Sequence, residues 1–470
     1  MSKFRIEKDS IGEIEVPNDA LWGAQTQRSL KNFAIGDQVF PISFIHAYII
    51  LKAAAAKTNY QLGAIEKAES DLIEQACEKL LTGAHDDQFP LKIWQTGSGT
   101  QTNMNVNEVI ANLASEIGGG KRGEKKPVHP NDHVNCSQSS NDSFPTAMHI
   151  ATAQTVVHQL LPALSILKKS LDKKSEEFKD LVKIGRTHLQ DAVPLTLGDV
   201  FSGYTQLVSD HISDVHQVLE RVFELPIGGT AVGTGLNAPK GFDSRVVDEI
   251  SIRAKLPFTV TPNKFAGLSA HMPLCALSGV LANTAASMHK IANDIRLLGS
   301  GPRCGLGEII LPANEPGSSI MPGKVNPTQA EAVTMVAMHV QGAHQAVING
   351  STHGHLELNV YKPLIIYNIL TSIAIISDAA RSFSKNCISG ITANHTRISA
   401  YLDNSLMLVT ALNPVIGYDN AAKIAKYAYE NHLSLKESAV KLDIMSADAF
   451  DKAIDTQQMA RPHPVEEEDD

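Results

Sequence analysis

Residues 317–327, GSSIMPGKVNP, combine polar side chains with a backbone that glycine loosens and proline restricts. The pair Asn326–Pro327 predicts a helix start, with Asn326 as the N-cap and Pro327 as the first helical residue. The unpaired N–H groups of such a start, together with the Lys324 ammonium, would attract an anion. The segment therefore indicates chemistry on a negatively charged molecule.

Two other interpretations of this segment need weighing. Any Gly/Ser loop before a capped helix has a similar composition, so the residues alone leave a purely structural role open. A phosphate-binding loop does not fit, because that pattern needs glycine where Ser318 stands and serine or threonine where Val325 stands.

Two further segments are rich in hydroxyl and amide groups. One comprises Gly97-Ser98-Gly99-Thr100 with the asparagines that follow as far as Asn107, and the other is SQSSND at 137–142, just before a predicted long helix. Polar helix caps could explain either one. Beside a lysine-bearing loop, both are better interpreted as hydrogen-bond cradles for a carboxylate.

His188 lies in the polar stretch 185–191, GRTHLQD, ahead of Pro194. A single histidine is more often structural than catalytic. Polar neighbours on both sides favour a role in a site, where an imidazole can exchange protons near neutral pH.

A metal site is not expected. The close histidine pairs are His129–His133, which Pro130 keeps off one helical face, and His353–His355, which has no carboxylate motif around it. The five cysteines are scattered and never in CxxC spacing, which excludes a disulfide scaffold and a structural zinc site and fits a reducing cytosol.

Two remaining motifs carry weaker signals. The basic group between Lys121 and Lys126 is by default a solvated loop, although a small-anion site is an alternative. The glycine-rich run at 228–235 does not satisfy the dinucleotide-binding pattern, and no strand is predicted before it.

Composition bounds the class of protein. The 470 residues are 43% hydrophobic and 19% charged, with a net charge of −9, so global disorder is excluded and nucleic acid is disfavoured as the main partner. No stretch approaches the roughly 18 uninterrupted apolar residues of a membrane span, and the first residues resemble no targeting signal. We expect a large, soluble, cytoplasmic protein of two to four domains.

The elements that must position these residues are mostly helices. Apolar residues recur at three- and four-residue steps over His271–Gly299 and over Met148–Asp180, where Pro162 predicts a kink. Ordinary core packing is the default explanation of such apolar stripes, but helices this long also predict a bundle between subunits. The short strands expected are 4–7 and 13–16. Loops are expected at 95–107, 117–141, 184–194, 226–237 and 299–327, shorter helices after Thr396, and a mobile acidic tail at 466–470.

Taken together, these segments resemble those of a known family. The 317–327 segment is similar to the signature of the fumarase/aspartase superfamily, and the resemblance extends over nearly the whole chain. It is carried by residues 21–26, 97–107, 129–142, 185–194, 228–237 and 413–418. Within the superfamily the chain most resembles the class II fumarases, which are metal-independent, because His188 stands where aspartases carry glutamine and Gly323 where they carry alanine.

The resemblance implies an all-α, three-domain fold with a central bundle of long helices that assembles into a homotetrameric core. The implied domains are 1–138, 139–395 and a small helical domain at 396–470 with the acidic tail. It also implies reversible hydration of fumarate to L-malate, in the citric acid cycle, without a cofactor or metal. The substrate would be a small dicarboxylate, and neither nucleic acid nor membrane would be a partner.

The resemblance also implies the roles of individual residues. Ser318 would be the base that acts at carbon, His188 with Glu331 would handle water, and Lys324 with Asn326 would stabilise the negative charge. The remaining substrate contacts implied are Ser98, Thr100, Ser139, Ser140, Asn141 and Thr187. An accessory dicarboxylate site would use Lys126, His129, Asn131 and Asp132, but the family usually has arginine at the first position, and lysine cannot make a bidentate contact with a carboxylate.

Two alternatives remain at this stage. An ammonia lyase acting on aspartate or a related amino acid is disfavoured by His188. A non-catalytic structural protein, of the kind that the superfamily supplies to the lens, is disfavoured because Ser318, Lys324, Asn326 and Glu331 are all present.

Overall fold

The computed structural model describes residues 3–461, so the predicted acidic tail lies outside the described residues. The chain divides into two compact units. The first comprises Met1–Ala163, His211–Ala286 and Val336–Asp378, and the second comprises Leu164–Asp210, Ser287–Met335 and Ala379–Asp470. The division into three domains inferred from the family resemblance stays a prediction.

The first unit contains the N-terminal elements and several short ones from the middle of the chain. In order they are β1 (Phe4–Lys8), β2 (Glu13–Pro17), α1 (Ala24–Asn32), α2 (Ile42–Gln61), α3 (Lys67–Leu80), η1 (Asp86–Gln88), α4 (Thr100–Ile117), η2 (Pro130–Val134), α5 (Ser140–Thr155), η3 (Val156–Leu160), β5 (Glu224–Leu225), α8 (Phe242–Ala254), β6 (Thr259–Val260) and α9 (Lys264–Ser269).

The second unit contains two small sheets and the C-terminal helices. They are β3 (Val182–Thr187), β4 (Gln190–Thr196), β7 (Ile309–Ile310), η4 (Ile388–Gly390), β8 (Thr392–Ala393), α13 (His395–Asn404), η5 (Leu406–Leu412), α14 (Asn413–Ile416), α15 (Tyr418–Asn431), α16 (Leu435–Lys441), α17 (Ala447–Ala453) and α18 (Thr456–Met459).

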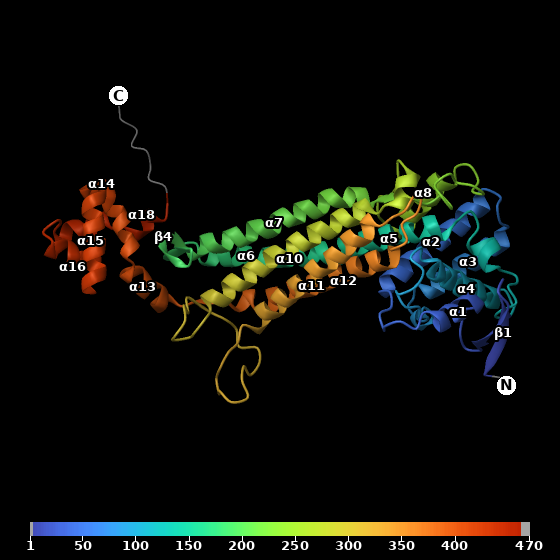
Figure 1. Cartoon of the computed structure of the whole chain (residues 1–470), viewed down its shortest axis with the longest axis horizontal. Helices are drawn as coiled ribbons and strands as arrows, with labels where there is room; N and C mark the ends of the chain where they lie inside the picture. The colour runs from blue at the N-terminus through green and yellow to red at the C-terminus, as the bar shows by residue number, and fades with distance from the viewer. Residues whose placement is uncertain (1–2, 462–470) are drawn as a thin grey trace, which may run out of the picture. The chain divides into compact units, whose positions relative to one another are not determined.

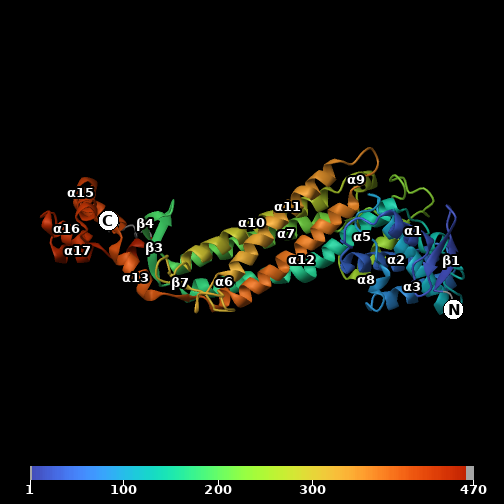
Figure 2. The same cartoon turned by 60° about the horizontal axis from the view of Figure 1, so that its bottom comes forward.

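Five long helices contribute residues to both units. They are α6 (Leu161–Glu177), α7 (Leu197–Val222), α10 (Met272–Leu298), α11 (Thr328–Thr352) and α12 (Lys362–Asn386). Within each unit, their segments lie side by side (Figures 1 and 2). In α10 the apolar residues that recur at three- and four-residue steps, from Leu274 to Ile295, are buried, which confirms the helix predicted over His271–Gly299.

The predicted kink near Pro162 is present as an interruption of the helix. A π-helical turn, η3, separates α5 from α6 and ends just before Pro162. Proline has no N–H to donate to the carbonyl four residues earlier, and the wider turn accommodates that missing bond.

The strands form four two-stranded sheets among the described residues. β1 pairs antiparallel with β2, from Phe4 opposite Pro17 to Lys8 opposite Glu13, as predicted. The expected loop at 184–194 is wrong, because this segment lies within the β3–β4 hairpin, whose register shifts between Ile184 and Arg186. The expectation of a mainly helical chain with little sheet is confirmed.

An aromatic cluster fixes α5 against α2 in the first unit. The ring of Phe144 lies 4.9 Å from that of Phe44 and 6.0 Å from that of Tyr48, and all three side chains are fully buried. Edge and tilted contacts of this kind stabilise beyond the area that they bury. The start of α5, where a candidate binding segment lies, is therefore attached to a rigid core.

Two helical segments, 140–177 and 362–390, have the length and hydropathy of a membrane span. In each, 56% of the apolar window is buried inside the chain itself. Buried core helices have the same length and composition, so packing within the protein accounts for both segments.

Candidate active site

A chain of hydroxyl groups joins the starts of two helices in the first unit. Ser98 Oγ lies 2.9 Å from Thr100 Oγ1, which lies 2.8 Å from Ser140 Oγ. Thr100 begins α4 and Ser140 begins α5. The two predicted hydroxyl-rich segments therefore meet at these three side chains.

Two glycines allow this approach. A Cβ at Gly97 would lie 1.2 Å from the carbonyl oxygen of Val360, and Gly99, whose φ is +81°, would place a Cβ 2.1 Å from the Phe144 ring. Only a residue without a side chain fits at either position. Close packing against the Val360 backbone and the Phe144 ring thus sets where Ser98 and Thr100 lie.

Ser139 and Asn141 are held at the start of α5. The Ser139 side chain accepts a bond from the Asn141 N–H, and Asp142 reaches back to the Ser139 N–H, so that a capping box closes the helix start. The Asn141 Nδ2 group donates to the carbonyl of Ala231 at 2.8 Å. This segment is therefore ordered by contacts on both sides.

The asparagines after Thr100 do not form the expected cradle. Residues 100–107, expected as part of the 95–107 loop, lie in helix α4, and Asn103, Asn105 and Asn107 are buried within it. The Nδ2 groups of Asn103 and Asn107 both donate to Asn135 Oδ1, each at 3.1 Å. The prediction that these three amides face a ligand is wrong, since their bonds lie inside the protein.

A buried lysine, which the sequence did not assign to the site, bonds to three amide side chains in this region. Lys52 Nζ donates to Asn103 Oδ1 at 2.8 Å, to Gln138 Oε1 at 2.9 Å and to Asn135 Oδ1 at 3.0 Å. Burial lowers the pKa of Lys52 to about 7, while the charge of Asp142 acts in the opposite direction. The signal was a lone lysine inside the most apolar stretch of the chain.

The candidate accessory site is a helical turn. His129 is the N-cap of η2, and its Nδ1 accepts bonds from the Asn131 and Asp132 N–H groups and lies 3.3 Å from the Asp132 carboxylate. Pro130 therefore starts a helical turn rather than preventing one. Lys126 and Asn131 are exposed. Three of the four predicted residues are thus neighbours on one exposed turn.

His188 lies at the tip of the β3–β4 hairpin in the second unit. Thr187 pairs with Gln190, and the two residues between them, His188 and Leu189, have φ values of 55° and 59°. Two positive φ values in a two-residue hairpin loop are usually supplied by Asn and Gly, so a histidine and a leucine are strained there. The β3–β4 pairing thus places an exposed imidazole at the tip of the hairpin.

The loop at 317–327 is closed on itself in the same unit. Ser318 Oγ accepts bonds from the Ile320 N–H at 3.2 Å and the Met321 N–H at 3.1 Å, and the Gly317 N–H donates to the Lys324 carbonyl at 3.1 Å. The Ser318 hydroxyl proton remains available to a further acceptor. These bonds hold Ser318 and Lys324 on one compact turn.

The helix after this loop starts one residue later than predicted. α11 begins at Thr328, and the Pro327 carbonyl accepts its first bond, from the Glu331 N–H. Asn326 is therefore not the N-cap, and its side-chain amide donates to the Gly317 carbonyl instead. Glu331 lies half-buried in the first turn of α11.

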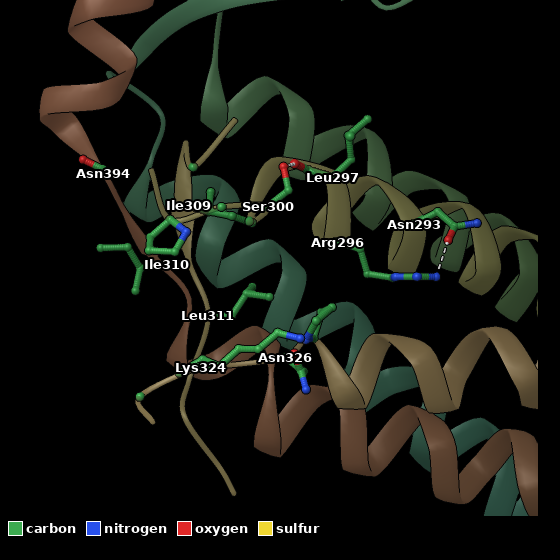
Figure 3. A pocket seen from close by; sticks show the side chains of 17 residues that line it. Asn293, Arg296, Leu297, Ser300, Ile309, Ile310, Leu311, Lys324, Asn326 and Asn394 are labelled. Carbon is green, nitrogen blue, oxygen red and sulfur yellow. Dashed lines mark hydrogen bonds between the residues drawn. The ribbon is translucent and has the colours of Figure 1, made fainter. Parts of the chain in front are cut away.

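Lys324 and Asn326 line a cavity of about 640 Å³ in the second unit, together with Arg296 of α10. Figure 3 shows Arg296 extending from its helix, with its guanidinium bonded to Asn293 at 3.2 Å, and Lys324 and Asn326 side by side on the loop. Cationic and amide donors around one cavity suit a carboxylate. Among residues 3–461, no group of three or more His, Cys, Asp or Glu side chains is placed to hold a metal ion.

The residues predicted for the main site come from both units. Ser98, Thr100, Ser139, Ser140 and Asn141 belong to the first unit, and Thr187, His188, Ser318, Lys324, Asn326 and Glu331 belong to the second. Hydrogen bonds join Ser98, Thr100 and Ser140 into one group. In the described part of the second unit, no bond joins the 187–188 pair to the 318–326 loop.

Comparisons with known proteins find similar sequences and structures over nearly the whole chain. Residues 12–342 match a family model described as lyase, and residues 408–461 match one described as the fumarase C C-terminus. The chain is 58% identical to the class II fumarate hydratase of Thermosynechococcus vestitus, over 95% of this chain and 96% of the relative. It is 57% identical to the mitochondrial fumarate hydratase of Danio rerio, over 98% and 90%. The crystal structure of the class II fumarase from Schistosoma mansoni matches with a TM-score of 0.96 and 44% identity, covering 98% of this chain and all of that one.

Proposed function

The chain belongs to the class II fumarate hydratases, a family of lyases, and from this premise we propose how its own residues perform the reaction. The protein is a hydro-lyase that adds water reversibly across the double bond of fumarate to give L-malate. In the reverse direction a proton leaves the carbon next to a carboxylate. The carboxylate then carries additional negative charge, and the site must stabilise it.

The observation that carries the proposal is the cavity beside Lys324 and Asn326. An ammonium and an amide project into it beside the first turn of α11. Each such donor, aimed at developing charge, is worth roughly 10²–10³ in rate. We assign Lys324 and Asn326 to the carboxylate whose charge increases.

Ser318 and His188 would transfer protons on opposite sides of the substrate. Ser318 is the base at carbon, and the two N–H groups that donate to its oxygen would stabilise the oxygen when it is negatively charged. His188 activates or releases water, and Glu331 orients the His188 imidazole. Thr187, Ser98, Thr100, Ser139, Ser140 and Asn141 would hold the substrate carboxylates through neutral donors.

We propose that these groups meet in a homotetramer in which three chains contribute to each site. The segments 139–141, 187–188 and 318–326 would come from different copies. One observation supports this: α11 exposes large apolar side chains, with Met335 at 65% and Met338 at 59%. Exposed apolar side chains on a long helix favour burial against another copy.

The reaction would need no metal or other cofactor, because the proposed residues supply every proton transfer and all charge stabilisation. We also propose that the protein acts in the cytoplasm as part of the citric acid cycle. The accessory site at Lys126, His129, Asn131 and Asp132 would bind a dicarboxylate weakly, since Lys126 offers a point charge rather than a fork.

The test is the loss of fumarate ultraviolet absorbance on addition of purified protein, after prolonged treatment with a chelator. We expect full activity and formation of L-malate. A strict requirement for added iron or zinc would contradict the metal-free mechanism. Release of ammonia from aspartate at a comparable rate would instead identify an ammonia lyase.

A further inference from the structure

Asp142 is a fully buried carboxylate that binds two distant segments of the first unit at once. One oxygen accepts the Ser139 N–H at 2.9 Å. The other accepts the Gly228 N–H at 3.0 Å and the Thr230 N–H at 2.8 Å. The side chain is 0% exposed. Asp142 therefore joins the start of α5 to a loop almost ninety residues later in the chain.

That loop is the glycine-rich run that fits no nucleotide-binding pattern. Gly228 has a φ of +84°, and a Cβ there would lie 2.6 Å from the Cβ of Asp243. Thr230 also has a positive φ, 52°, which is unusual for a β-branched residue. A backbone in this conformation needs specific bonds to hold it, and Asp142 provides two of them.

The same loop contacts a proposed substrate-binding side chain directly. Asn141 Nδ2 donates to the Ala231 carbonyl at 2.8 Å, one residue beyond the Thr230 N–H that Asp142 accepts. The loop and the Ser139–Asn141 segment are thus held together at adjacent points. A shift of either one would move the Asn141 amide.

Burying this carboxylate is unfavourable to folding at neutral pH. Burial raises the pKa of Asp142 to about 6, although the backbone donors of Ser139, Thr230 and Gly228, and the charge of Lys52, act to lower it. The ionised carboxylate is therefore stabilised less in the folded chain than in water. Despite this cost of ionisation, the carboxylate makes three directed bonds, which fix the positions of the two segments that they join.

We propose that Asp142 is a positioning residue that fixes the Ser139–Asn141 segment for binding of a substrate carboxylate by tying it to the loop at 228–231. The inference rests on the proposed function, because it takes Asn141 and its neighbours as carboxylate contacts. Asp142 itself does not touch the substrate. Its effect is on the geometry of the residues that do.

The variant Asp142→Asn tests this, because the amide keeps the shape but presents an N–H₂ group to N–H donors. We expect the KM for fumarate, and the Kd for the unreactive dicarboxylate succinate measured by calorimetry, to rise at least tenfold. The change in kcat should be smaller than the change in KM. The fall in Tm should be too small to explain the weaker binding by unfolding. A merely structural role predicts instead that Tm falls and that binding by the folded fraction is unchanged.

Glu108→Gln is the matched control. Glu108 is another buried carboxylate of the first unit that accepts backbone N–H groups, from Gly23, Gln25 and Thr26 at the start of α1, and burial also raises its pKa. Glu108→Gln should leave the KM for fumarate and the Kd for succinate within twofold of the wild-type values. An equal loss of binding in both variants would overturn the proposal.

Two more variants complete the design. If Asp142→Asn fails to fold, Gly228→Ala displaces the other side of the same contact, and it should raise both constants at least fivefold. Values within twofold of the wild type in the folded variant overturn the inference. If Asn141→Ala leaves KM unchanged, the assignment of the segment as a substrate contact fails and this inference fails with it. If Asn141→Ala raises KM and Asp142→Asn does not, only the inference fails.

Discussion

The Arg186 guanidinium lies 2.7 Å from the carboxylate of Glu308, which is fully buried. The second oxygen of Glu308 lies 3.0 Å from the Lys183 ammonium, so one buried anion serves two cations of β3. Arg186 is two residues before His188 in the same hairpin. The strained tip that presents the imidazole is therefore anchored at its base by an ionic contact.

Glu308→Gln should strongly destabilise the protein. Removing the anion leaves the buried Lys183 ammonium and the half-buried Arg186 guanidinium without compensation, and breaking a buried ion pair typically costs about 3–5 kcal/mol. Thermal unfolding should show a lower Tm by several degrees, with a larger loss than for Glu177→Gln, whose carboxylate pairs with Lys174 but is 42% exposed. Equal effects of the two substitutions would mean that the Glu308 cluster is not compensating buried charge.

Ser318→Ala and His188→Asn should each lower kcat by about 10²–10⁴, the usual contribution of a positioned acid or base. Both residues are outside the buried core, so Tm should change little. Steady-state kinetics with fumarate and with L-malate, beside thermal unfolding, measure the two effects. A near-normal kcat in either variant would remove that residue from the mechanism.

Lys324→Ala and Lys126→Ala should differ sharply. Lys324 lines the cavity of the proposed main site, whereas Lys126 lies on the exposed loop before η2. The first substitution should abolish turnover, and the second should leave steady-state rates within about twofold, since exposed ionic contacts are weak. Comparable losses from both would show that Lys126 belongs to the main site.

Mixed assemblies of Ser318→Ala and His188→Asn should regain activity that neither parent has. If the two residues of one site come from different chains, random assortment gives roughly a quarter of sites with both intact. The two variants are unfolded together in equal amounts, reassembled and assayed. Mixed tetramers without activity, identified by mass, would show that one chain supplies both residues.

Lys52 should make stability depend on pH above neutrality. Its pKa is about 7 when folded, below the ordinary value of 10.5, so the unfolded chain binds more protons than the folded chain between these values. Stability from this group therefore increases as pH rises from 7 to 10. The Tm of the wild type relative to Lys52→Met should rise over this range. A constant or falling difference would mean that Lys52 does not lose its proton in the folded protein.

The sequence allowed the main elements to be predicted because their signals are local and repeated. The spacing of apolar residues from Leu274 to Ile295 predicts a long helix. Pro162 predicts the interruption between α5 and α6. The residues of the 317–327 loop were recognisable for the same reason. Their types indicate an anion site, although by themselves they leave a structural role open.

The errors arose where tertiary contacts decide the structure. Asn103, Asn105 and Asn107 have poor helix propensity, yet they lie in α4, where Asn103 and Asn107 bond to Asn135 near the Lys52 ammonium. Gly185 and Pro194 favoured a loop, but they lie in a hairpin held by the ionic contact to Glu308. Neither the buried lysine's partners nor those of Asp142 can be read from spacing, because they are far apart in sequence.

The absence of side chains at Gly97 and Gly99 has a consequence for how this protein can vary. In a library of all single substitutions, neither position should tolerate any replacement, even alanine, because the Val360 carbonyl and the Phe144 ring occupy the space. Neither glycine has a side chain that could contact the substrate or transfer a proton. Selection for activity would therefore identify both glycines as essential. The cause would be the space that neighbouring atoms occupy, not a chemical role of the glycines in the reaction.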